Sequence, residues 1–226
     1  MPSRPEVTGK RGSGSPMKEL FPQELSPLVR IVDDEETVRN SEKFIFRIIG
    51  LESETYGSAE EFIDRVDETR PGCIVADLRM KEINGLEMMT ILRSRGIKLP
   101  IVFLTGHGTV DSAVLALKNG AYDFLQKPVQ PERLQEIVLK MIEIDKERRA
   151  KEKAVEEKQR LLATLTERER QVLERVALDQ MNKVIACDLS IAEHTVKIHR
   201  ANALRKLGVR TAMEAANFLK EARSNE

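Results

Sequence analysis

Several residue types are scarce in this chain of 226 residues, and each scarcity excludes a class of protein. There is no tryptophan, and aromatic residues make up only 4% of the sequence, which argues against the stacking platforms that bind single-stranded nucleic acids. The two cysteines, Cys73 and Cys187, lie far apart and form neither a metal-binding spacing nor a disulfide framework. This use of cysteine predicts a reducing, cytoplasmic location.

Long apolar runs and an excess of one charge are also missing. No run approaches the ~20 apolar residues that span a bilayer, and no apolar segment follows the N-terminal charges, so we expect neither a membrane span nor a secretory signal. Lysine plus arginine and aspartate plus glutamate both number 37, which gives zero formal net charge. Any binding to nucleic acid would therefore depend on a local basic patch.

The composition along the chain divides it into four parts. Residues 1–27 hold many prolines and glycines and no apolar periodicity, which predicts a disordered leader. Residues 28–145 alternate between short apolar runs and helical periods, and residues 165–226 show helical patterns only. Between them, residues 146–164 are mostly charged, with opposite charges four apart, which predicts a solvated helical linker. We therefore expect two folded domains joined by a helix.

The second part predicts a doubly wound, flavodoxin-like α/β domain. Runs rich in valine and isoleucine at 28–32, 73–76 and 101–104 are typical of strands buried in a parallel sheet, while 51–56 alternates like an edge strand and 124–126 is a short fifth run. Helical periods separate the runs, with apolar residues at Val38, Phe44, Ile45 and Ile48 in the first helix and at Val110, Val114 and Leu117 in the fourth. Five such βα units make a five-stranded parallel sheet.

Polar side chains follow the strands of this predicted sheet. Asp33 and Asp34 come after the first strand, Asp77 after the third, Thr105 after the fourth and Lys127 after the fifth. In a sheet of order 2-1-3-4-5, ligands bind at the carboxyl ends of strands one and three, the two that carry the aspartates. Three converging carboxylates repel one another unless a cation neutralises them. Mg²⁺ is the natural candidate because it prefers carboxylate, water and phosphate oxygens.

The same residues suit phosphoryl transfer. The ammonium of Lys127 and the hydroxyl of Thr105 would hold the oxygens of a tetrahedral phosphate while a carboxylate attacks the phosphorus in line. Asp77, alone at the end of the central strand, is the expected nucleophile. A single aspartate after a strand is usually a turn or a helix cap, but five residues of this kind at four strand ends favour a site.

The stretches IVDDEE, DLRM with NGLE, FLTGHG and GAYDFLQKPV closely resemble the receiver domain of two-component response regulators, over residues 28–145. The resemblance implies that a sensor histidine kinase phosphorylates Asp77. It also implies that Mg²⁺ is bound by Asp34, Asp77 and the backbone carbonyl of Arg79, with Asp33 assisting through water. Thr105 and Phe124 would be the two switch residues.

Three loop residues lie near this site in the sequence. Lys81 stands four residues after the phosphoacceptor, where the family usually has proline. The lifetime of the phosphorylated form in other family members therefore does not predict the lifetime in this chain. Arg79 and His107 lie two residues after the phosphoacceptor and after the switch threonine, positions that in the family flank the path of the hydrolytic water. We hypothesise that they tune autodephosphorylation; the alternative is that both are solvent-exposed loop side chains.

The last part predicts a small domain of four helices, at 167–178, 183–189, 193–207 and 213–222. Its stretch 197–210 holds five lysines or arginines and no acid. On a helical wheel, Val196, Ala203 and Leu207 share one face, and Lys197, Ile198, Ala201 and Arg205 lie on the other. A basic face with an exposed isoleucine suits a helix in the major groove of DNA, although an isolated basic stripe is more often a solvated helix.

The stretches LTERERQVL, NKVIACDLS and HTVKIHRANALRKLGV closely resemble the LuxR-type helix-turn-helix domain of the FixJ/NarL class. The resemblance implies a scaffold helix at 183–189 and a recognition helix at 193–207. Lys197, Ile198 and Ala201 would face the groove, and the candidates for backbone contacts or packing are Asn182, Lys183, Thr195, His199 and Arg200. In two departures, Ala192 replaces a capping serine and Asp179 replaces a common glycine; losing the cap costs about 1 kcal/mol.

Together the two halves predict a transcriptional response regulator rather than a dedicated enzyme. We expect a phosphorylated receiver that pairs with a second copy through residues 109–145, a dimer that binds double-stranded promoter DNA, and no membrane partner. One alternative is a receiver that dimerises without phosphorylation, which Lys81 keeps open. The other is a haloacid-dehalogenase-like phosphatase, disfavoured because that family has a DxDxT-type pattern where residues 33–36 read DDEE.

Overall fold

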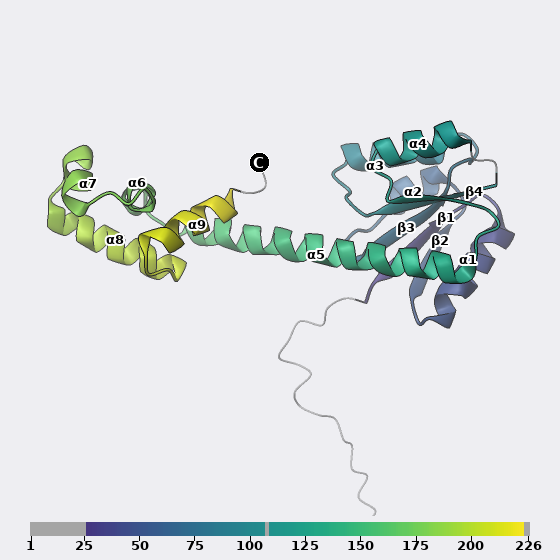
Figure 1. Ribbon diagram of the computed structural model, residues 1–226, viewed down its shortest axis with the longest axis horizontal. Helices are drawn as coiled ribbons and strands as arrows, with labels where there is room; N and C mark the ends of the chain where they lie inside the picture. The colour runs from purple at the N-terminus through teal and green to yellow at the C-terminus, as the bar shows by residue number, and fades with distance from the viewer. Residues whose placement is uncertain (1–25, 107–108, 224–226) are drawn as a thin grey trace, which may run out of the picture.

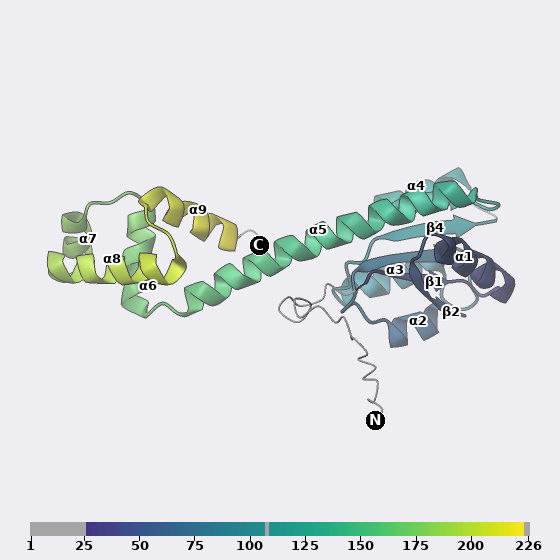
Figure 2. The same ribbon diagram turned by 90° about the horizontal axis from the view of Figure 1, so that it is seen from below.

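The computed structural model describes residues 26–106 and 109–223, so His107 and nearly all of the predicted leader lie outside the described residues. Figures 1 and 2 show an α/β domain and a helical domain at the two ends of one long helix. Within the described ranges, no helix is long and apolar enough to cross a membrane.

The first domain contains a parallel sheet of five strands. These are β1 (Leu28–Val32), β2 (Glu52–Tyr56), β3 (Gly72–Asp77), β4 (Ile101–Thr105) and β5 (Asp123–Gln126), in the order β2-β1-β3-β4-β5. All four pairings are parallel. The weakly apolar β2 lies at an edge, as predicted, and β1 and β3 lie side by side. The doubly wound fold is confirmed.

Five helices belong to this domain: α1 (Glu36–Ile48), α2 (Ala59–Arg65), α3 (Gly85–Ser94), α4 (Val110–Lys118) and α5 (Pro131–Ala163). Helices α2, α3 and α4 share one apolar core with the sheet, and α1 and α5 share the other. Successive residues of β3 alternate between the cores, with Ile74 in the first and Val75 in the second. Because both faces are covered, the central strands need apolar residues at every position, which explains their continuous runs.

The apolar stripes predicted for α1 and α4 are wrong in part. In α1, Phe44 and Ile48 are exposed, and the buried positions are Glu42 and Phe46, which lie four residues apart on the inner face. In α4 the small Ala116 is buried against the sheet. The larger residues of that helix face solvent: Val110 (80% exposed), Val114, Leu115 and Leu117. The apolar period of α4 therefore marks a free surface rather than a core face.

Helix α5 is a single element of 33 residues, so the predicted linker 146–164 continues the last helix of the α/β domain. Pro131 occupies its first turn. The inward-facing apolar residues from Leu134 to Ile142 are buried, whereas Ile144 is exposed and Asp145 next to it is buried. The boundary that the composition suggested between residues 145 and 146 falls inside this helix.

The second domain consists of α6 (Glu167–Ala177), α7 (Asn182–Leu189), α8 (Glu193–Leu207) and α9 (Ala212–Ala222). Thr166 and Glu169 form a capping box at the start of α6, and Gly208 ends α8 with a φ of 68°. Ala192 gives α8 no side-chain cap, and Asp179 has a φ of 58°, where glycine is favoured. Both departures from the helix-turn-helix pattern therefore have structural counterparts.

Candidate functional site

Three aspartates meet at the carboxyl ends of β1 and β3. Asp33 follows β1 directly, Asp77 ends β3, and the strands pair with Val32 opposite Ala76, so the two carboxyl groups emerge side by side. One carboxylate oxygen each from Asp33, Asp34 and Asp77 lies within 4.8 Å of the others. Asp33 and Asp77 are buried and Asp34 is half-buried. The fold thus brings together the carboxylates that the sequence placed at separate strand ends.

Lys127, after β5, points its ammonium group at the same carboxylates. Its Nζ lies 2.5 Å from Oδ2 of Asp33 and 3.2 Å from Oδ2 of Asp77. Burial lowers the pKa of Lys127, but the hydrogen bonds and charges of the two aspartates outweigh it and hold that pKa above its usual value. Three carboxylates against one ammonium leave an excess of negative charge. Such an oxygen-rich set fits a hard divalent cation such as Mg²⁺.

Backbone groups orient the two buried carboxylates. Oδ1 of Asp33 accepts a hydrogen bond from the Glu35 amide at 2.8 Å, and Oδ1 of Asp77 accepts one from the Arg79 amide at 3.1 Å. The other oxygen of each aspartate faces Lys127. Helix α3 begins against the same strand end at Gly85, where a Cβ would come within 2.6 Å of the Asp77 carbonyl oxygen. Only glycine permits this approach, so the NGLE motif seats α3 beside Asp77.

The remaining residues predicted for this site take different positions. Thr105 is the last residue of β4, the neighbour of β3, and is buried in the same row of strand ends. Phe124 lies on β5 opposite Phe103 and is half-buried against the core of α2, α3 and α4. Arg79 and Lys81 are exposed. The switch roles of Thr105 and Phe124, the carbonyl ligand of Arg79 and the effect of Lys81 stay predictions.

Sequence reasoning missed one group beside the pocket, the carboxyl of Glu42 in α1, which is only 5% exposed. Burial is the main cause that raises the pKa of Glu42 to about 8; the charges of Asp33 and Asp77 contribute in the same direction, and the charge of Lys127 opposes them. Near neutral pH most of this carboxyl is therefore protonated. The sequence holds one sign of this burial. Glu42 lies four residues before Phe46 and therefore on the same face of the amphipathic helix α1.

Helix α8 carries separate buried and exposed faces, as the helical wheel predicted. Val196, Ala203 and Leu207 are buried, whereas Lys197, Ile198, Ala201 and Arg205 are exposed. Lys206 belongs to neither face: its ammonium contacts Glu169 at 2.6 Å and donates to the Thr164 carbonyl at 3.0 Å. The hydrogen bond from Lys206 lowers the pKa of Glu169. One of the five basic residues of this stretch therefore stabilises the domain.

The other residues predicted to contact DNA divide into a packed set and an exposed one. Nη1 of Arg200 donates a hydrogen bond to Oδ1 of Asn182 at 3.1 Å, which ties α8 to the start of α7. Thr195 and His199 are half-buried, and Lys183 is exposed. The geometry therefore favours Arg200 and Asn182 as residues that position α8.

Comparison with known families supports both halves of this description. The family described as "Response regulator receiver domain" matches residues 29–139, and the family described as "Bacterial regulatory proteins, luxR family" matches residues 163–219. The transcriptional regulatory protein TdiR of Thauera aromatica is 36% identical over 197 residues, which cover 87% of each chain. The chain belongs to the response regulators. FixJ of Rhizobium meliloti is 40% identical to the regulator over 183 residues, 79% of this chain and 88% of FixJ.

Solved structures confirm the folds and superpose on this chain to different degrees. The response regulator StyR gives a TM-score of 0.80 at 36% identity and covers 87% of this regulator and 99% of StyR. Full-length FixJ from B. japonicum covers 88% and 98% of the two chains at 30% identity, yet its TM-score is 0.55. The FixJ N-terminal fragment alone, over 52% of this chain, already gives 0.50. Over a similar share of this chain, full-length FixJ therefore superposes less closely than StyR does.

Proposed function

We propose that this regulator accepts a phosphoryl group on Asp77 from a sensor histidine kinase and that phosphorylation controls its binding to promoter DNA as a dimer. The observation that carries the proposal is the contact of Lys127 with both Asp33 and Asp77. That contact holds a fixed positive charge beside a buried carboxylate at the end of the central strand. The arrangement supports attack by that carboxylate on a phosphorus atom whose oxygens carry negative charge.

In the proposed reaction, a carboxylate oxygen of Asp77 attacks the phosphorus of a phosphorylated histidine. The phosphorus–nitrogen bond breaks, and the imidazole keeps its electron pair. Lys127 neutralises a phosphoryl oxygen and Thr105 donates a hydrogen bond to another. A bound Mg²⁺ supplies further positive charge to these oxygens. The residues that would hold Mg²⁺ are Asp34, Asp77 and the Arg79 carbonyl, with Asp33 acting through water.

The exposed apolar residues of the receiver support dimerisation through residues 109–145. Val110, Val114 and Leu117 of α4 and Ile144 of α5 are exposed. Apolar patches of this kind mark interaction surfaces. Shifting a two-state equilibrium from 1:99 to 99:1 takes about 5.5 kcal/mol, and burial of this patch in the phosphorylated dimer would supply part of it.

In the proposed dimer, two copies of α8 face two half-sites of a promoter. Lys197, Ile198 and Ala201 are exposed where base edges would be read, and Lys183 is exposed where a phosphate contact would form. We assign Asn182, Thr195, His199 and Arg200 to backbone contacts or to the support of α8. A partnership with chromosomal DNA and a signalling kinase implies a cytoplasmic protein.

The test is phosphorylation by a small donor. The purified protein is incubated with Mg²⁺ and acetyl phosphate and weighed by intact-mass spectrometry. We expect a gain of one phosphoryl group in the wild type and in Asp64→Asn, an exposed aspartate on α2, and no gain in Asp77→Asn. An unmodified wild type would favour the phosphorylation-independent module, and repeated turnover of the donor would favour the phosphatase. Either result would overturn the proposal.

A further inference from the structure

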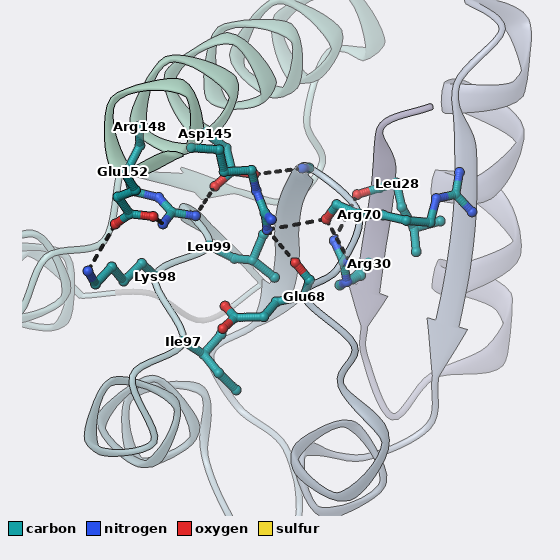
Figure 3. A network of polar contacts seen from close by, with 12 residues as sticks. Leu28, Arg30, Glu68, Arg70, Ile97, Lys98, Leu99, Asp145, Arg148 and Glu152 are labelled. Atoms are coloured by element: carbon teal, nitrogen blue, oxygen red, sulfur yellow. Dashed lines mark hydrogen bonds and ion pairs between the residues drawn. The ribbon is translucent and has the colours of Figure 1, made fainter. Parts of the chain in front are cut away.

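We propose that an ionic clamp around the buried Asp145 makes α5 a rigid connection, so that contacts at the base of the receiver sheet set the position of the DNA-binding domain. The clamp consists of Asp145, Arg148, Arg149 and Glu152 of α5 with the receiver residues that they contact, Glu68, Arg70, Gly72 and Lys98. Figure 3 shows these contacts between α5 and the loops beside it. Three of its residues, Arg148, Arg149 and Glu152, lie in the stretch 146–164 whose composition predicted a solvated linker.

Asp145 is the centre of the clamp and is fully buried, at 0% exposure. Its Oδ2 accepts hydrogen bonds from the Gly72 amide at 3.0 Å and from Nε of Arg149 at 2.7 Å, and its Oδ1 accepts one from Nη2 of Arg148 at 2.5 Å. A buried carboxylate is tolerated only when it is paired in this way. Separating Asp145 from these partners would leave a buried charge without compensation. The energetic cost of that state favours the arrangement in which all three hydrogen bonds are formed.

Arg149 carries the clamp to the loop between α2 and β3. Its Nη2 donates to the carbonyls of Glu68 at 2.6 Å and Arg70 at 3.4 Å. The fully buried Arg30 of β1 donates to the same Arg70 carbonyl at 3.2 Å and also to the Asp67 carbonyl. The loop ends at Gly72, where a Cβ would lie 1.9 Å from the Leu28 carbonyl oxygen, so only glycine fits. The loop is thus held from β1 on one side and from α5 on the other.

A second branch extends the clamp by one more turn of α5. Nη1 of Arg148 contacts Oε2 of Glu152 at 2.6 Å, and Oε1 of Glu152 contacts Nζ of Lys98 at 2.9 Å. Lys98 lies in the loop before β4. Both branches reach the amino ends of the strands, opposite the aspartate pocket. The receiver therefore holds α5 as far as Glu152.

The other end of α5 belongs to the DNA-binding domain. Leu161 and Leu162 pack into the core around Leu173 and Phe218. Lys158 pairs with Glu221 of α9 at 2.5 Å, and Gln159 donates to the Ala222 carbonyl at 3.0 Å. Of the α5 residues between these contacts and the clamp, 153–157 make no hydrogen bond or ion pair to either domain in the described structure. These five residues rise about 7.5 Å and belong to the continuous helix α5, so the two sets of contacts are joined by unbroken helix.

Two solved relatives of similar length superpose on this chain to different degrees. StyR matches 87% of this chain with a TM-score of 0.80, whereas full-length FixJ matches 88% of it with a TM-score of 0.55. In this chain the clamp connects α5 to the receiver at Glu68, Arg70, Gly72 and Lys98. When two receivers pair, a rigid α5 would give the two copies of α8 a defined separation.

The test measures the distance between the domains in the full-length protein. One nitroxide label is attached to Cys187, which is exposed on α7, and another to the cysteine introduced by Lys43→Cys on the exposed side of α1; Cys73 is buried and stays unlabelled. The test variant is Asp145→Asn, which removes the buried charge at constant size. The control is Glu156→Gln, because Glu156 is exposed and, among residues 26–106 and 109–223, pairs only with Arg160 of the same helix. A flexible reference carries Ala154→Gly and Val155→Gly.

We expect a narrow distance distribution for the wild type and for Glu156→Gln, and a clearly broader one for Asp145→Asn and for the flexible reference. Hydrogen exchange of amides 146–152 should accelerate about tenfold or more in Asp145→Asn only, since these turns lose their anchor. If Asp145→Asn does not fold, Arg149→Met serves instead, because it leaves Asp145 bound to Gly72 and Arg148. A folded clamp variant with wild-type width and exchange, or a wild type as broad as the flexible reference, would overturn the proposal.

Discussion

Among single residues, Glu42 stands out because an acidic side chain is buried on the apolar face of a helix. An acid in the apolar face of α1 keeps its proton because burial and two neighbouring aspartates disfavour the charge. Glu42 lies beside Asp33 and Lys127, so the free-energy cost of burying its carboxyl arises next to the functional pocket. Functional sites are where proteins commonly retain such destabilising groups.

Glu42→Gln should stabilise the receiver domain, by an amount that depends on pH. The pKa of Glu42 is about 8 when folded against 4.5 for the free side chain, so the folded state binds the proton more tightly. Stability that the protonated carboxyl contributes is complete below the unfolded pKa and is lost as the pH rises toward the folded one. The advantage of the glutamine variant should therefore grow to a few kcal/mol between about pH 4.5 and pH 8.

Urea unfolding in magnesium-free buffer at several pH values measures this difference. The matched control is Glu143→Gln, an exposed glutamate on α5. A stability difference between Glu42→Gln and the wild type that stayed constant across this pH range would contradict the assignment of the raised pKa to Glu42.

Asp179 offers a second prediction for a single residue. Its φ of 58° lies in the left-handed region, where an L-residue other than glycine costs roughly 1 kcal/mol. Asp179→Gly should therefore raise the free energy of unfolding of the DNA-binding domain by about 0.5–1 kcal/mol, and Asp179→Ala should lower it. Thermal unfolding followed by circular dichroism decides the sign. A glycine variant less stable than the wild type would show that the aspartate side chain offsets its backbone strain.

At the scale of elements, the two helices that begin at functional positions start differently. Asn84 caps α3 with a full capping box, whereas Ala192 leaves α8 without a side-chain cap. Ala192→Ser should add about 1 kcal/mol to the stability of α8 and slow hydrogen exchange in its first turn. Ala201→Ser, at an exposed interior position of the same helix, should not do so. Equal protection of the first turn in both variants would exclude capping as the cause.

The junction between β3 and α3 yields a prediction about phosphorylation. A Cβ at Gly85 would lie 2.6 Å from both the Asp77 carbonyl oxygen and a ring carbon of Phe103, so Gly85→Ala must move α3 or the end of β3. We expect this variant to be phosphorylated by acetyl phosphate at least tenfold more slowly, because small displacements of a nucleophile are costly. Gly57→Ala is the control, since its Cβ meets neighbours only at 3.6 Å. Equal phosphorylation rates in the two variants would refute the argument.

At the scale of the whole molecule, the three clustered aspartates predict that Mg²⁺ stabilises one domain only. Binding to the folded receiver should add about 2.7 kcal/mol at a hundredfold excess over the dissociation constant. Hydrogen exchange of the full chain should therefore slow in the receiver core when Mg²⁺ is added and stay unchanged in α6–α9. Asp34→Asn should remove most of this effect, because Asp34 supplies a carboxylate to the cluster. Equal protection in both domains, or none, would contradict the proposed site.

The fold and most of the aspartate pocket could be predicted because they rest on local patterns and on chain order. Buried parallel strands need continuous apolar runs, and β1 and β3 lie together in a doubly wound sheet, so Asp33, Asp34 and Asp77 converge wherever that fold forms. The faces of α1 and α4 were harder to predict. Their apolar residues lie on more than one side, and only the packed sheet decides which side is buried.

The sequence by itself determined the two domains, the strand order and the identity of the polar residues at the strand ends. Only the tertiary structure decided that Glu42 and Asp145 are buried and that the charged residues after Asp145 clamp α5 to the receiver. The physical reason is that burying a charge depends on partners distant in sequence, such as the Gly72 amide, which no local pattern around Asp145 contains. The local sequence pattern predicts that a helix forms, but the elements that pack against the helix determine which of its faces is buried.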